Sequence, residues 1–238
     1  MKSYVIHLIR NMPCEGNLEG RYIGRTESPL ALESIAQLAR RKRQYQYPAA
    51  AAFYASPSTR CVDTLKILYP QADPEVVLEL AECDFGEWEN KTAQELQNDP
   101  RFAAWMAGGG TAAPPGGESG AVFVQRVCQG FELLVKNLVA QGQTSAVLVT
   151  TAGVMGSLLE AYGLPQAPAH QWMCQPGCGY SVRITPGLWM RSGVMEVFAQ
   201  LPGGEDRESP DHLVVDLARE AAQRAYGSGD GGSPETEA

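Results

Sequence analysis

Short apolar runs alternate along the chain with longer segments in which apolar residues recur every three to four positions. Short runs that are rich in β-branched residues are typical of buried strands, whereas the longer period is typical of amphipathic helices. Strands are predicted at residues 3–9, 50–56, 74–82, 145–150, 179–185, 188–193 and 194–201. Helices are predicted at residues 30–45, 57–69, 119–142 and 152–164, with a short one before residue 100.

This alternation predicts an α/β fold: one three-layer α/β/α domain, with helices on both faces of a mainly parallel central sheet. The domain is expected to cover residues 1–201. From residue 202 the composition changes, and residues 202–238 are predicted to form a C-terminal extension with a further helix at 211–226. The acidic, Gly- and Ser-rich end of this extension is predicted to be a disordered tail.

Composition and charge exclude several classes of function. The chain has 238 residues, 44% of them hydrophobic, and a formal net charge of −8. Nucleic acids and anionic membranes are bound by basic surfaces, so neither is expected as a partner. No apolar run approaches the roughly 20 residues of a membrane span. The apolar closing segment 188–201 leaves a homodimer open.

The six cysteines are scattered without C-x-x-C pairs. No secretion signal is recognisable, so reduced thiols in a cytoplasmic protein are expected. Cys174 and Cys178 have the spacing of half a metal site, but no second pair of ligands is evident. We therefore predict neither a metal nor another cofactor.

Polar side chains follow four of the predicted strands. They are Arg10, Asn11, Ser56, Arg60, Glu82, Thr150 and Thr151. In α/β sheets ligands bind beyond the carboxyl ends of the strands, so we expect these side chains to share one site. Arg10 and Arg60 suit a phosphate monoester, because guanidinium groups donate forked hydrogen bonds to phosphate oxygens. Glu82 could donate a proton to a leaving oxygen.

Five segments around these residues resemble one family. LIRNM…GNLEGRYIGRTESPL, ASPSTRCVDT, LAECDFGEWEN, PGGES and VLVTTAGV are similar, in order and spacing, to motifs of the histidine phosphatase superfamily. The resemblance covers roughly residues 3–200 and implies the phosphoglycerate-mutase-like fold. ECDFGEWEN and PGGES look most like the branch of small-molecule phosphatases that includes α-ribazole phosphatase.

The resemblance implies a mechanism in which a histidine after the first arginine attacks phosphorus and a second histidine stabilises the transferring group. Arg10 and Arg60 match the family's phosphate clamp, and Glu82 matches its proton donor. The resemblance also implies a substrate loop, which it places at Asn17, Gly24 and Thr26.

Both histidine positions hold other residues. Asn11 stands where the family has the nucleophile, and Thr151 stands at the second position. The lone pair of an amide nitrogen is delocalised into the carbonyl, so Asn11 cannot form a phosphohistidine-like intermediate. Thr151 offers one neutral hydroxyl instead of an imidazole, and losing one such donor typically costs about 100- to 1000-fold in rate.

Other residues offer little compensation for the missing histidines. His7 lies within the first strand and is expected to be a core residue, while His170 and His212 fall in a connection and in the extension. The cysteines next to motif residues, Cys14, Cys61 and Cys83, leave a substitute thiolate nucleophile open, because two nearby arginines would lower a thiol pKa. Trp88, Trp105 and Trp172 are expected in the core or in a pocket wall.

Three hypotheses remain open. The favoured one is a pseudophosphatase that binds a small phosphorylated or anionic molecule, or a protein partner, with little or no turnover. The second is an active phosphomonoesterase or related hydrolase in which Glu82 assists direct attack by water. The third is a scaffold that binds a partner through its C-terminal extension.

Overall fold

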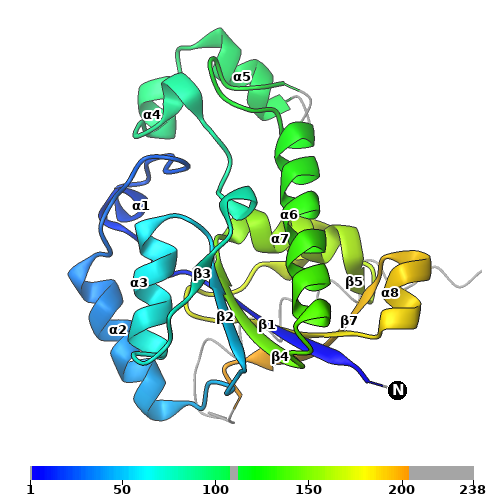
Figure 1. Cartoon of the computed structure of the whole chain (residues 1–238). Helices are drawn as coiled ribbons and strands as arrows, with labels where there is room; N and C mark the ends of the chain where they lie inside the picture. Colours follow the sequence, from blue (N-terminus) through cyan, green and yellow to red (C-terminus); the bar gives the residue numbers. More distant parts are fainter. Residues whose placement is uncertain (1, 108–111, 204–238) are drawn as a thin grey trace, which may run out of the picture. The chain divides into compact units, whose positions relative to one another are not determined.

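The computed structural model of the protein describes residues 2–107 and 112–203 (Figure 1). They contain a seven-stranded sheet with the order β3-β2-β4-β1-β6-β7-β5. The strands are β1 Tyr4–Arg10, β2 Ala52–Ala55, β3 Glu75–Val76, β4 Ser145–Thr150, β5 Gly163–Leu164, β6 Gly179–Ile184 and β7 Met195–Leu201. The helix predicted at 211–226 and the acidic tail lie outside the described residues.

Strand β1 lies at the centre of the sheet. It pairs in parallel with β4 and antiparallel with β6, and β2 runs parallel to both β4 and β3. Strand β7 runs antiparallel to β6 and parallel to β5. The sheet is therefore mainly parallel with two antiparallel pairings, and the predicted α/β fold is confirmed.

Helices cover both faces of this sheet (Figure 1). The longer helices of the fold are α2 Leu32–Gln44, α3 Thr59–Leu68, α5 Pro100–Ala107, α6 Gly120–Ala140, α7 Ala152–Tyr162 and α8 Pro186–Ser192, of which α5 lies away from the sheet (Figure 1). Shorter turns are α1 Glu15–Leu18, α4 Ala93–Leu96 and the 3₁₀ helices Leu78–Leu80, Gly86–Trp88 and Ala169–Trp172. None of the described helices is long and apolar enough to cross a membrane.

Alternate residues of the strands enter two separate cores. Ile6 and Leu8 of β1 pack with α6 and α7, while Ile9 packs with α2 and α3 on the other face. This follows from the strand geometry, in which successive side chains point to opposite faces. Because β1 and β4 are buried on both faces, their sequences read as nearly continuous apolar runs.

A third apolar cluster lies apart from the two sheet faces. Its buried members are Trp88, Leu96 and Phe102, and Tyr22, Phe85 and Trp105 pack against them. Trp172 is buried with the α6 and α7 core instead. Trp88, Trp105 and Trp172 are thus in or against apolar clusters, as expected.

Two predicted strands are wrong or shortened. Residues 188–192 belong to helix α8, which starts at Pro186 and is ended by Gly193 in the left-handed conformation with φ of 59°. The run 74–82 pairs with β2 only at Glu75–Val76. It then turns, and Leu80 is buried in the sheet core.

The N-terminus of α3 is capped by a side chain from another segment. Ser58 is the N-cap residue, but its side chain makes no capping hydrogen bond. Instead the carboxylate of Glu27 accepts hydrogen bonds from the Thr59 N–H at 3.0 Å and from the Thr59 hydroxyl. The start of α3 is therefore held by the loop that follows β1.

Candidate functional site

The site forms where the carboxyl ends of three parallel strands meet. Arg10 and Thr150 are paired in the register of β1 and β4, and the Asn11 N–H donates to the Thr150 carbonyl at 2.8 Å. Thr151 follows directly as the N-cap of α7. Strand β2 ends beside β4 and leads through Ser56 to α3, which carries Arg60 in its first turn. The strand-end residues predicted from the sequence therefore share one edge of the sheet.

Arg60 is buried although it carries a charge. Its side chain is held by the Ile23 and Gly24 carbonyls, which accept hydrogen bonds from Nη2 at 3.0 and 3.3 Å. Its Nη1 is also buried, but it has no hydrogen-bond partner within the described residues. A buried N–H of this kind costs free energy unless a ligand or water accepts from it.

Arg10 is anchored on the other side of the sheet edge. Its Nη1 donates to the Cys174 carbonyl at 2.5 Å, in the connection between α7 and β6. The Gly177 N–H donates in turn to the Arg10 carbonyl at 2.9 Å. Arg10 is only half-buried, in contrast to the buried Arg60.

Asn11 and Thr151 are both buried, but they differ in whether a side-chain polar atom has a hydrogen-bond partner. The Asn11 Nδ2 donates to the Met12 carbonyl at 2.7 Å. The Thr151 Oγ1 has no partner within the described residues. By contrast, the neighbouring Thr150 and Ser56 hydroxyls are hydrogen-bonded to each other at 2.7 Å, and the Ser56 hydroxyl also donates to the Leu80 carbonyl.

Glu82 reaches the same edge from the segment after β3. Its carboxylate accepts from its neighbour's backbone, the Cys83 N–H, at 2.8 Å and from the Gly153 N–H at 3.3 Å. The second bond places the carboxylate at the N-terminus of α7, where the helix dipole stabilises negative charge. A Cβ at Gly153 would lie 2.5 Å from Glu82 Oε1, so glycine permits this approach.

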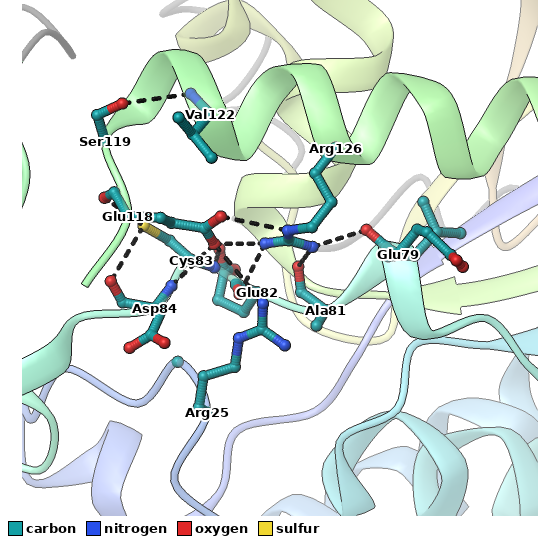
Figure 2. Close-up of polar contacts among 12 residues, drawn as sticks. Arg25, Glu79, Ala81, Glu82, Cys83, Asp84, Glu118, Ser119, Val122 and Arg126 are labelled. Atoms are coloured by element: carbon teal, nitrogen blue, oxygen red, sulfur yellow. Dashed lines mark hydrogen bonds and ion pairs between the residues drawn. The ribbon is translucent and has the colours of Figure 1, made fainter. Parts of the chain in front are cut away.

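A pair of side chains that the sequence reasoning missed fixes the Glu82 segment (Figure 2). Arg126 of α6 donates to the Glu79, Ala81 and Glu82 carbonyls at 2.7, 3.0 and 3.4 Å. It also donates to Glu118 through Nε at 3.2 Å and through Nη2. The sequence feature that could have indicated this pair is Glu118 in PGGES, followed eight residues later by Arg126 on the next helix.

Gly24 and Thr26 of the predicted substrate loop are bound by an internal carboxylate. The Gly24, Arg25 and Thr26 N–H groups donate to Glu89 at 3.1, 2.9 and 3.0 Å, and the Thr26 hydroxyl donates at 2.6 Å. Burial alone would raise the pKa of Glu89, but these hydrogen bonds, with one from the Phe85 N–H, lower it overall. Glu89 was not singled out from the sequence, although it lies in the GEWEN segment.

Asn17 has a local role in its described contacts. Its Oδ1 accepts from the Cys14 N–H at 3.4 Å and from the Cys14 thiol at 3.0 Å, which closes the short turn α1.

Gly24 makes a close approach to the Glu82 segment, because a Cβ there would lie 1.9 Å from the Cys83 carbonyl oxygen.

The thiols of Cys61 and Cys83 are not activated. Burial is the largest influence on both Cys61 and Cys83, and it raises each thiol pKa to about 12. The substitute thiolate that the sequence left open is therefore not supported at Cys61 or Cys83, because desolvation outweighs the nearby positive charge. Groups of three or more side chains able to hold a metal ion are not found among residues 2–107 and 112–203.

The described histidines lie within a strand or are exposed to solvent. His7 is half-buried in β1, its Nδ1 is 2.8 Å from the Ser181 hydroxyl, and burial lowers its pKa. His170 is exposed. His212 lies outside the described residues.

With this geometry in place, comparison with known proteins decides the family. The family model "Histidine phosphatase superfamily (branch 1)" matches residues 6–193, from β1 to the end of α8. The chain belongs to the histidine phosphatase superfamily. Its match contains all the strand-end residues described above.

Two relatives of this superfamily member have the same protein name. The chain is 27% identical over 198 residues to the adenosylcobalamin/α-ribazole phosphatase of Salmonella typhimurium, covering 82% of this chain and 92% of the relative. It is 25% identical over 183 residues to the protein of the same name from Escherichia coli, covering 74% and 88%. This member is therefore α-ribazole phosphatase-like within the superfamily.

Solved structures agree on the fold. A structure described as a putative α-ribazole-5'-P phosphatase from Escherichia coli matches with a TM-score of 0.71 at 21% identity, covering 85% of this chain and 99% of the other. The TTHB049 protein of Thermus thermophilus matches with a TM-score of 0.59 at 28% identity, covering 84% and 99%. The phosphoglycerate-mutase-like architecture expected from the sequence is confirmed.

Proposed function

We propose that this superfamily member binds phosphate or a phosphomonoester between Arg10 and Arg60 and turns it over little or not at all. The observation that carries the binding claim is the buried Arg60 Nη1, which lacks a hydrogen-bond partner in the described part of the chain. Thr151 Oγ1, at the same sheet edge, is a second buried group without one. Both can donate to an anion, and a phosphate oxygen accepts such bonds well.

The missing turnover follows from Asn11. At the place where the family's attacking histidine is expected, the side chain is an amide with a delocalised lone pair, and its N–H group is engaged with the Met12 carbonyl. Thr151 cannot supply the positive charge of an imidazolium. In this proposal Asn11 and Thr151 replace the catalytic pair while Arg10, Arg60 and Glu82 are retained.

The names of the relatives suggest the class of ligand. They are phosphatases of adenosylcobalamin or α-ribazole metabolites by name, so a small phosphomonoester is the ligand class we propose for this chain. We propose no nucleic acid, membrane or metal as a ligand of this chain.

The binding claim predicts a thermal shift with inorganic phosphate. A ligand at 100 times its Kd adds about 2.7 kcal/mol to the free energy of unfolding, which corresponds to a rise in Tm of roughly 5 to 10 °C for a domain of this size. Arg10→Gln should remove most of the shift, because it removes one half of the clamp. Arg101→Gln, an exposed arginine paired with Asp99 and Glu87, is the matched control and should keep it. Equal shifts in both variants would refute the clamp.

An active phosphomonoesterase is the second candidate function. The observation in its favour is the position of the Glu82 carboxylate. It accepts a hydrogen bond from the Gly153 N–H at the N-terminus of α7, two residues after Thr151. From there a carboxylate could accept a proton from attacking water. This candidate requires that the wild-type chain hydrolyses phosphomonoesters and that Glu82→Gln loses this activity.

A further inference from the structure

A third arginine, Arg25, lies next to the proposed clamp. It follows Gly24, whose carbonyl accepts a hydrogen bond from Arg60 Nη2. Its side chain extends from this loop towards the segment of Glu82 and towards Glu118 (Figure 2). Arg25 therefore belongs to the loop that holds the buried arginine of the clamp, and its side chain is directed towards Glu118 (Figure 2).

Arg25 is held only weakly in this position. Its Nη2 is 3.8 Å from Glu118 Oε1, and its side chain is 42% exposed. Exposed ion pairs contribute about 0 to 1 kcal/mol, and a pair this long lies outside hydrogen-bond distance. The guanidinium can consequently exchange Glu118 for another anion at little cost.

Glu118 does not depend on Arg25 for its charge balance. It accepts two hydrogen bonds from Arg126 and one from the Asp84 N–H at 3.0 Å. Its side chain is 12% exposed, so loss of every partner would be costly. Because Arg126 and Asp84 stay in place, Arg25 can turn away without leaving a buried charge unpaired.

Only the side chain of Arg25 would have to move. Its backbone N–H is fixed by Glu89 at 2.9 Å, and the N–H groups of Gly24 and Thr26 on either side are bound to the same carboxylate. A rigid loop that carries one long, weakly paired cation is a suitable arrangement for reading a second group of a bound ligand.

We propose that Arg25 is a specificity-determining residue that selects, among phosphomonoesters, those with a second anionic group. The phosphate lies in the Arg10–Arg60 clamp, and the second group replaces Glu118 as the partner of Arg25. This inference rests on the proposed phosphate clamp. A local cation is needed for such selection because the chain as a whole, with a formal charge of −8, repels anions.

The test uses ligand pairs that differ only by a carboxylate in place of a methyl group. One pair is ethyl phosphate and phosphoglycolate, and a longer pair is butyl phosphate and 4-phosphooxybutanoate. Calorimetric titration of the full chain should show that the carboxylated member of at least one pair binds about 3- to 10-fold tighter, as expected for one accessible charge-assisted contact.

In Arg25→Gln this ratio should fall to about one, while the alkyl phosphates bind as in the wild type. Arg25→Lys should keep part of the preference, since it keeps the charge. Arg101→Gln is the matched control, because it removes the same charge from another exposed arginine whose ion pairs are with Asp99 and Glu87.

Equal binding of both members in the wild type, or a preference that survives in Arg25→Gln, would overturn the role of Arg25 and leave the clamp standing. Failure of all four ligands to bind would overturn the clamp and the selection together.

Discussion

At the scale of single residues, the site is defined by which buried polar atoms have partners. Thr150 and Thr151 are neighbours and both are buried, but the Thr150 hydroxyl is bonded to Ser56 while the Thr151 hydroxyl has no partner in the described structure. A buried hydroxyl without a hydrogen-bond partner lowers the stability of the fold. Its presence at Thr151 is explained if the hydroxyl binds a further molecule. In our account that partner is the ligand.

This difference predicts opposite effects for two substitutions of the same kind. Thr151→Val removes a hydroxyl without breaking a bond, so the free energy of unfolding should stay the same or rise by up to about 1 kcal/mol, whereas phosphate affinity should fall roughly tenfold. Thr150→Val breaks the bond to Ser56 and should cost about 1 to 3 kcal/mol. Denaturant unfolding and calorimetric titration measure the two effects. A stability loss in Thr151→Val with unchanged affinity would argue against a ligand-directed hydroxyl.

Part of this residue-level picture could be predicted from the sequence. Arg10, Arg60, Glu82 and Thr151 follow strands, and parallel strands end at one edge, so their proximity was predictable from topology. Glu89, Glu118 and Arg126 were not, because each of them also binds backbone groups far away in the sequence, namely those of Gly24, Asp84 and Glu79. The raised thiol pKa values of Cys61 and Cys83 could not be predicted, because burial cannot be read from a neighbouring arginine.

At the scale of elements, the site depends on loops tied to each other by carboxylates. Glu27 holds the start of α3 to the loop after β1, Glu118 joins α6 to the Asp84 backbone, and Glu89 gathers three N–H groups of the Gly24–Thr26 loop. These bonds bring together segments that are 30 to 60 or more residues apart. The strand after residue 74 and the apolar run at 188–193 were misjudged because short apolar runs fit either a strand or a helix.

The Glu89 contact predicts a pH-dependent stability. Its pKa is lowered in the folded state, so its stabilisation is present above the ordinary glutamate pKa of about 4.3 and is lost as the pH falls through the lowered value. Glu89→Gln should therefore reduce the free energy of unfolding at neutral pH, by about 1 to 3 kcal/mol, and the difference from wild type should shrink in acid.

Glu87→Gln is the matched control for this measurement. Glu87 is 61% exposed and pairs with Arg101 at 3.4 Å, so its substitution should change stability by less than about 0.5 kcal/mol at any pH. Unfolding curves at several pH values compare the two variants. A Glu89→Gln deficit that is the same at pH 3 and pH 7 would contradict the role given to its charge.

At the scale of the whole molecule, a histidine phosphatase fold brings polar strand-end residues to one edge of its sheet. The family model covers residues 6–193, and the sheet order, the two cores and the converging strand ends all lie within it. Alternating strands and helices sufficed to predict the α/β class, because the repeat of apolar residues is set by the geometry of each element. The antiparallel pairings of β6 could not be predicted, since they depend on which edge of the sheet the chain returns to.

The central claim is that this fold binds a phosphomonoester without hydrolysing it. The most direct measurement is phosphate release from a panel of phosphomonoesters by the wild type, by Glu82→Gln and by the double variant Asn11→His/Thr151→His. We predict no release above background for the wild type and Glu82→Gln, and release by the double variant, in which an imidazole can attack phosphorus. Release by the wild type that disappears in Glu82→Gln would contradict the claim and identify the chain as an active phosphatase.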